Sequence, residues 1–232
     1  MIPNKKAVLS WSGGKDSALA LRKVLQEKTF DIISLFTTIT KETQTSSVHS
    51  ISLEILKEQA NSIGIPLVAI SVSEDLRDYQ DQMKTLVNHF LSLGVEFFIF
   101  GDLSLSNNKV YRENLLNPLG IQVVEPLWGK SSEEVIEDFL KSGLKAKIIV
   151  VQADKLDASF IGKEINENLI KSLPPQIDSC GENGEYHTLI YDGDIFKNAI
   201  DFKLGPINLI SNEIQLENGE NRIFKYYQAE IL

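Results

Sequence analysis

The hydrophobic positions of this chain follow two periods from the N-terminus to about residue 150. Short apolar runs, typical of buried strands, are separated by longer stretches in which apolar residues recur every three to four positions. The strand-like runs cover residues 7–11, 31–38, 67–72, 97–100, 121–124 and 147–152. Strands that alternate with amphipathic helices are typical of a parallel sheet with helices on both faces. We therefore predict an α/β fold built on an open parallel sheet.

The helices are delimited by ordinary start and stop signals. We expect helices over residues 17–25, 49–63 and 73–93, and a further one after Ser131, which forms a capping box with Glu134. If the first five strands are ordered three, two, one, four, five, the order reverses between strands one and four. Ligands of such sheets bind at that point, beyond the carboxyl ends of the strands.

The pattern changes after about residue 153. A short helix over residues 164–173 is closed by two prolines, and residues 200–232 alternate as strands do, with Asn218-Gly219 as the expected hairpin turn. We expect a smaller C-terminal α+β portion beside the sheet. The predicted division is a nucleotide-binding domain over residues 1–129 and a substrate-binding portion over residues 130–232.

Composition narrows the class of protein. Of the 232 residues, 43% are hydrophobic and 24% are charged, as in ordinary globular proteins. The net charge of -9 argues against an extended nucleic-acid interface, which needs clustered Lys and Arg. The lone cysteine, Cys180, excludes an intramolecular disulfide. With no signal peptide and no apolar run long enough to cross a bilayer, we expect a cytoplasmic enzyme without a membrane partner. A homodimer is left open.

The strongest chemical signal is the segment Ser12-Gly13-Gly14-Lys15-Asp16-Ser17 between the first strand and the first helix. Paired glycines let backbone approach an anion, and the helix N-terminus directs N–H groups and positive potential at it. Two hydroxyls and a lysine complete a pyrophosphate cradle, which indicates an ATP site that leaves AMP on another molecule. The alternative is a glycine turn that binds nothing.

Other phosphate-binding motifs do not fit. Gly129-Lys130-Ser131 has Val124 where a Walker-type loop needs its first glycine, and no G-x-G-x-x-G follows a strand.

A second group of polar residues follows the fourth strand. Gly101-Asp102 is expected to face the glycine loop, and Asp102 is a candidate Mg²⁺ ligand, with helix or turn capping as its alternative. Arg112 could clamp a phosphate, or it could form a surface ion pair. Asp16 lies beside the expected phosphates and would repel them unless it binds metal or caps the loop.

The third signal is the segment from Asp178 to Thr188. Its glycines Gly181 and Gly184 indicate a tight loop, which Asp178, Glu182 and Glu185 make acidic. Unaided, three acids favour a solvated loop, and a zinc site from Cys180, Glu182 and His187 lacks the usual spacing. The other two histidines, His49 and His89, are expected to be solvent-facing helical residues.

These segments resemble a known family. The first loop resembles the Ser-Gly-Gly-x-Asp-Ser signature of PP-loop ATP pyrophosphatases. The segment Cys180-Gly181-Glu182-Asn183-Gly184-Glu185-Tyr186-His187-Thr188, with Pro126-Leu127-Trp128 and Gly101-Asp102…Arg112-Glu113, is similar to the diphthine–ammonia ligase family. The segment from Thr43 to His49 departs from the Met-Tyr-rich pattern of the eukaryotic form.

The resemblance implies an adenine-nucleotide α-hydrolase-like sheet, ATP and Mg²⁺ as cofactors, and ammonium as a substrate. It implies ATP-dependent amidation of diphthine on elongation factor two, giving diphthamide, AMP and pyrophosphate. Expected ATP contacts are Ser12, Gly13, Gly14, Lys15, Asp16, Ser17, Gly101 and Arg112. Expected acceptor contacts are Trp128, Cys180, Gly181, Glu182, Asn183, Gly184, Glu185, Tyr186 and His187. Expected catalytic residues are Lys15, Asp16, Asp102, Glu182 and Glu185. The alternatives are a PP-loop ligase for another small-molecule or tRNA acceptor, and a nucleotide sensor without turnover.

Overall fold

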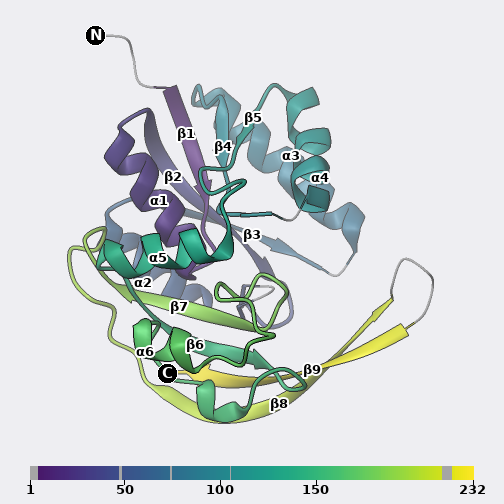
Figure 1. Ribbon diagram of the computed structural model, residues 1–232. Coiled ribbons are helices and arrows are strands. Elements are labelled where there is room, and N and C mark those ends of the chain that lie inside the picture. The colour runs from purple at the N-terminus through teal and green to yellow at the C-terminus, as the bar shows by residue number, and fades with distance from the viewer. Residues whose placement is uncertain (1–4, 47–48, 74, 105, 216–220) are drawn as a thin grey trace.

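A computed structural model describes residues 5–46, 49–73, 75–104, 106–215 and 221–232, arranged around two β-sheets (Figure 1). The first sheet has five parallel strands in the order β3-β2-β1-β4-β5. Its strands are β1 (Lys5–Ser10), β2 (Phe30–Thr40), β3 (Leu67–Val72), β4 (Phe97–Ile99) and β5 (Gln122–Val124). The predicted α/β class is confirmed. The strands have the order that the sequence analysis assumed, and the order reverses between β1 and β4.

Helices cover both faces of this sheet because successive strand residues point to opposite sides. Ala7 and Leu9 of β1 belong to the same buried cluster as residues of α1 (Lys15–Glu27) and α2 (Leu53–Ile63). Val8, between them, belongs to the cluster formed with α3 (Leu76–Ser92) and the end of α4 (Ser106–Leu116) on the other face.

The second sheet is antiparallel, in the order β7-β6-β9-β8. Its strands are β6 (Lys145–Gln152), β7 (Tyr186–Asp192), β8 (Leu204–Gln215) and β9 (Asn221–Ile231). The prediction that residues 147–152 form a last strand of the parallel type was therefore wrong. A strand buried on both faces shows the same continuous apolar run in either sheet, so periodicity does not identify its neighbours.

The connecting elements complete the fold. They are α5 (Ser132–Ser142), α6 (Glu167–Ser172) and the short 3-10 helices η1 (Asn117–Leu119) and η2 (Ala158–Phe160). The predicted capping box of α5 is present, with Ser131 and Glu134 bonding each other's backbone. The predicted turn at Asn218-Gly219 lies outside the described residues.

One helix joins the two sheets. Residues of α1 pack on β7, and a single buried cluster contains Leu9 of β1, Leu21 of α1 and Ile190 of β7. The backbone N–H of Ile190 also donates to the Gly13 carbonyl oxygen at 2.9 Å. The loop between β1 and α1 is therefore held against the second sheet.

The N-terminus of α2 differs from the prediction. The helix begins at Leu53, because the Ser52 hydroxyl accepts from the Ile55 N–H and caps it. His49 lies in the preceding turn, outside the helix. Among the described helices, none combines the length and apolar character needed to cross a bilayer.

Candidate active site

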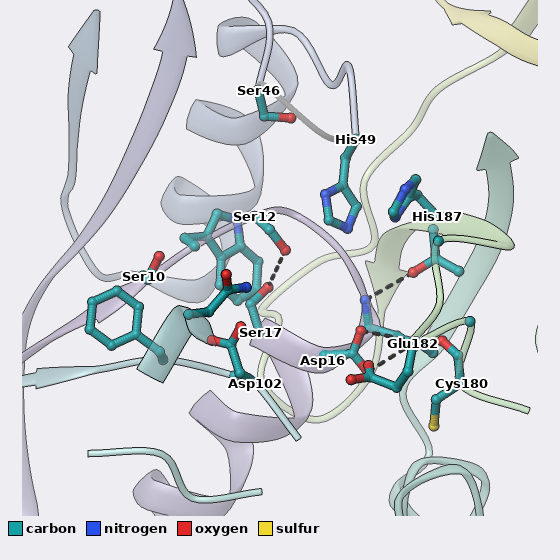
Figure 2. A pocket seen from close by; sticks show the side chains of 18 of the residues that line it. Ser10, Ser12, Asp16, Ser17, Ser46, His49, Asp102, Cys180, Glu182 and His187 are labelled. Atoms are coloured by element: carbon teal, nitrogen blue, oxygen red, sulfur yellow. Dashed lines mark hydrogen bonds and ion pairs between the residues drawn. The ribbon is translucent and has the colours of Figure 1, made fainter. Parts of the chain in front are cut away.

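A cavity of about 560 Å³ lies where the parallel strand order reverses, and its far wall comes from the second sheet (Figure 2). Many of the predicted site residues line it, namely Ser12, Lys15, Asp16, Ser17, Gly101, Asp102, Arg112, Cys180, Gly181, Glu182, Asn183, Gly184, Tyr186 and His187. Four others, Gly13, Gly14, Trp128 and Glu185, are not part of the lining. The glycine loop (residues 12–17) and the acidic loop (residues 178–188) lie more than 160 positions apart in the sequence, and they face one space only because the chain folds into two sheets.

The glycine loop owes its shape to close packing. Gly13 has φ +80°, and a methyl group there would lie 2.8 Å from Ile51 and Leu56. Ser12 Oγ accepts from the Gly14 N–H at 3.3 Å and lies 3.1 Å from Ser17 Oγ. Both hydroxyls line the cavity beside the N-terminus of α1, which is the arrangement that binds phosphate oxygens.

The end of β4 also approaches this loop closely. A methyl group on Gly101 would lie 3.0 Å from the Asp16 carbonyl group and the Ser17 nitrogen. Glycine at position 101 therefore allows the end of β4 to pack against the first turn of α1, and both segments line the cavity.

A buried glutamine holds the loop from behind. Gln59 of α2 is fully buried and accepts from Trp11 Nε1 at 2.8 Å. Its amide nitrogen donates to the carbonyl oxygens of Gly13 at 3.1 Å and Ile190 at 2.7 Å. The sequence analysis missed Gln59, since its only local signal is a polar residue on the apolar side of a helix.

Lys15 links the two walls of the cavity. Its buried Nζ lies 2.9 Å from the Asp16 carboxylate, donates to the Cys180 carbonyl oxygen and sits 5.4 Å from the centre of the Tyr186 ring. Its backbone N–H donates to Thr188 Oγ1 at 3.0 Å. Burial opposes the charged form, but Asp16, Tyr186 and Cys180 together outweigh burial and raise the pKa of Lys15. The ammonium is therefore a fixed positive charge beside the loop.

The two glutamates of the acidic loop have different surroundings. Glu185 is buried, and its carboxylate accepts from the backbone N–H groups of Asn183 at 2.9 Å and Asp178 at 3.3 Å. Lys155 lies 3.7 Å from it. Glu182 instead lines the cavity, where burial and then the Asp16 charge raise its pKa to about 7. Glu185 shapes the loop, while Glu182 is the carboxyl group poised to exchange a proton near neutral pH.

Glycine is required within this loop as well. Gly181 has φ +74°, and a methyl group there would lie 2.8 Å from the Tyr186 carbonyl oxygen. Tyr186 is itself buried and donates its hydroxyl to the Ser179 carbonyl oxygen at 2.5 Å.

Cys180 contributes its backbone rather than its thiol. The buried Sγ donates to the Ser132 carbonyl oxygen at 3.2 Å, and burial raises the pKa of the thiol to about 12. A thiol that is neutral at physiological pH is a poor nucleophile and a poor metal ligand.

Arg112 is held at the opposite side of the cavity. Its guanidinium pairs with Asp102 and lies 4.1 Å from the centre of the Phe100 ring, with the buried Glu125 carboxylate 3.6 Å away. Glu125 was missed by the sequence analysis; burial raises its pKa, and no partner meets hydrogen-bond geometry at either of its oxygens.

The donor set for a divalent cation is limited. The described residues contain no group of three or more His, Cys, Asp or Glu side chains arranged to hold a metal ion. A single carboxylate at Asp102 still fits Mg²⁺, which takes one or two protein ligands and completes its shell with phosphate oxygens and water.

Trp128 lies apart from the predicted acceptor site. It does not line the cavity, and the Nζ of Lys109 sits 4.3 Å from its ring centre. The family resemblance implied an acceptor contact for Trp128, but the turn after β5 places this residue outside the cavity lining.

The expectation for His49 was wrong. It is half-buried, lines the cavity, and its ring centre lies 4.9 Å from that of His187. His89 is exposed on α3, as predicted.

Comparison with known proteins agrees with this geometry. Residues 4–123 match the family model of the diphthamide synthase N-terminal domain, and residues 131–227 match that of its C-terminal domain. The chain is 33% identical over 132 residues to diphthine–ammonia ligase of Schizosaccharomyces pombe, covering 55% of this chain and 21% of that protein. It is 31% identical over 111 residues to diphthine–ammonia ligase of Bos taurus, covering 46% of this chain and 42% of that protein.

This chain thus spans less than half the length of these relatives. Among solved structures, the U34-tRNA thiolase NcsA of Methanococcus maripaludis with its 4Fe-4S cluster is 14% identical, with a TM-score of 0.38 over 60% of this chain and 57% of that one. The two family models together cover nearly all of the residues from 4 to 227, so the chain belongs to the diphthamide synthase family.

Proposed function

We propose that this protein is an ATP-dependent C–N ligase that amidates the carboxylate of diphthine on elongation factor two with free ammonia, releasing AMP and pyrophosphate. One observation carries the proposal. The glycine loop, which follows a strand of the parallel sheet, and the acidic loop, which leads into a strand of the antiparallel sheet, line the same cavity.

The nucleotide side is assigned from the positive and donor groups. Ser12, Ser17 and the Lys15 ammonium surround the N-terminus of α1, where the β- and γ-phosphates would lie. Arg112 would exchange its Asp102 partner for a phosphate oxygen, and Asp102 would then hold Mg²⁺. Bound Mg²⁺ would neutralise phosphate charge and thereby make the α-phosphorus easier to attack.

The acceptor side is assigned from the acidic loop. Diphthine carries a trimethylammonium group, which acidic and aromatic side chains attract. Glu182 and Tyr226 line the cavity and supply both kinds of group, whereas the Tyr186 ring already faces Lys15. This assigns the cation-binding role to Glu182 and Tyr226 instead of Trp128.

The reaction follows from this placement. The acceptor carboxylate oxygen attacks the α-phosphorus, the bond to the β-phosphate oxygen breaks, and preorganised donors of the glycine loop stabilise the departing pyrophosphate. Ammonia then attacks the acyl adenylate and displaces AMP. The nitrogen must lose a proton in this step, and the Glu182 carboxylate, with a pKa of about 7, is suited to accept it.

The test is a complete reaction with ATP, ammonium chloride and elongation factor two that carries diphthine. We expect equal amounts of AMP, pyrophosphate and amidated acceptor, measured by chromatography and intact-protein mass spectrometry. Omission of either ammonium or acceptor should abolish amide formation. Nucleotide binding without any AMP would favour a sensor, and AMP formation stimulated only by a different acceptor would favour another ligase of the superfamily.

A further inference from the structure

Two histidines from separate parts of the chain meet above the glycine loop. His49 comes from the turn before α2 and His187 from β7, and their ring planes are tilted by 52° (Figure 2). Both line the cavity, and the mechanism above uses neither.

The glycine loop is shaped to accept His49. A methyl group on Gly14 would lie 2.7 Å from His49 Nε2 and 3.1 Å from the Thr188 carbonyl oxygen. Gly14 is also the residue that precedes the first turn of α1. The absence of a side chain there lets an imidazole edge sit beside the N-terminus of this 13-residue helix, next to the free N–H groups that attract anions.

The charges around the pair favour neutral rings when no anion is present. The charge of Lys15 disfavours protonation of both rings, whereas the charge of Glu185 favours protonation of His187, and the two rings lie beside each other. Burial, together with Lys15, lowers the pKa of His187 to about 4, and burial, His187 and Lys15 lower that of His49. A pyrophosphate on the loop would bring negative charge to the rings and reverse this balance.

We propose that His49 and His187 form the outer wall of the pyrophosphate subsite and take up a proton when pyrophosphate occupies it. This rests on the proposed function, in which pyrophosphate is the leaving group. When the bond from the α-phosphorus to the bridging oxygen breaks, its electron pair remains on the pyrophosphate oxygen. An imidazolium N–H then donates a hydrogen bond to that developing negative charge, and the proton returns to solvent when pyrophosphate leaves.

The experiment uses the whole protein and inorganic pyrophosphate, without ATP or acceptor. Titration calorimetry in neutral buffers of different ionisation enthalpy measures both affinity and protons exchanged. We expect the wild type to take up more protons than the His49→Gln/His187→Gln variant. Pyrophosphate itself exchanges the same number of protons in both titrations, so subtracting one value from the other leaves the contribution of the two histidines. We also expect each single variant to bind about tenfold more weakly, as for loss of one charge-assisted hydrogen bond. His89→Gln, on the exposed surface of α3, is the matched control and should behave as wild type.

Two results would overturn the inference. One is equal affinity and equal proton uptake in the wild type and the double variant, and the other is no pyrophosphate binding by the wild type. If His187→Gln lowers the melting temperature strongly, His49→Gln alone decides, because His49 lies in a turn outside the sheets. If the wild type and the double variant take up equal numbers of protons and the wild type still forms amide, only this inference fails. If the wild type takes up more protons than the double variant but forms no amide product, only the proposed function fails.

Discussion

The glycine loop (residues 12–17) and the acidic loop (residues 178–188) are both shaped by glycines, but they present groups of opposite charge to the cavity. Each places a glycine with positive φ against backbone or core, at Gly13 and at Gly181. The glycine loop then presents donors and positive charge to the cavity, whereas the acidic loop presents a carboxyl group. Lys15 joins them through the Cys180 carbonyl oxygen. Under the proposed function, the backbone N–H groups, hydroxyls and lysine of the glycine loop would hold the leaving group, while the side chains of the acidic loop would serve the acceptor.

The largest expected effect comes from removing the charge that joins the loops. Lys15→Met should reduce AMP formation by about a hundredfold to a thousandfold, because a preorganised positive group near the leaving pyrophosphate is lost. The measurement is the single-turnover rate of AMP release. Lys57→Met, on the exposed surface of α2, is the control. An unaltered rate in Lys15→Met would remove the lysine from the mechanism.

Changing the backbone of the glycine loop should affect both binding and stability. In Gly13→Ala, the positive φ and the 2.8 Å contacts with Ile51 and Leu56 should lower the free energy of unfolding by about 2–4 kcal/mol and weaken ATP binding. Urea unfolding and nucleotide titration check this. Gly120→Ala is a useful control, since it has φ +89° but nothing within 4 Å of the added methyl group. If both variants lose the same stability and ATP affinity, close packing is not what shapes the loop.

The buried carboxylate of the acidic loop should matter mainly for folding of that loop. Glu185→Gln replaces one acceptor oxygen with an N–H donor facing the N–H groups of Asn183 and Asp178. We expect a loss of about 1–3 kcal/mol in unfolding free energy and impaired use of the acceptor, with ATP affinity retained. A variant that unfolds like wild type but binds ATP poorly would contradict this division of roles.

The cavity-facing carboxyl group should show its effect in the pH dependence. Burial raises the pKa of Glu182 from 4.5 to about 7, so the folded protein holds this proton more tightly than the unfolded chain does. Ionisation of Glu182 therefore lowers the free energy of unfolding as the pH rises from 4.5 through about 7. Relative to wild type, Glu182→Gln should lose this decline and should also lose amide formation near neutral pH. Urea unfolding at several pH values measures this dependence. If the free energy of unfolding changes with pH in the same way in both proteins, the raised pKa of Glu182 is contradicted.

Local signals in the sequence were enough to predict the parallel sheet and the glycine loop. The apolar runs predicted the strands of the parallel sheet, and Ser131 with Glu134 predicted the start of α5. The strand order was an assumption taken from sheets of this type, and the structure has that order. Features that depend on partners distant in the chain were not predictable in this way. The run at residues 147–152 gives no indication of which sheet it joins, and nothing near His49 indicates that it meets His187. Likewise, the acidic loop does not reveal that Glu185 is buried and Glu182 exposed to the cavity, because burial is set by the second sheet.

The most direct test is the position of the phosphates in a crystal structure with α,β-methylene ATP and magnesium. The account predicts that the β- and γ-phosphates contact Ser12, Ser17 and the N–H groups at the start of α1, with the α-phosphate directed toward Glu182. An analogue bound with its γ-phosphate toward Glu182, or with its adenine on the glycine loop, would contradict it.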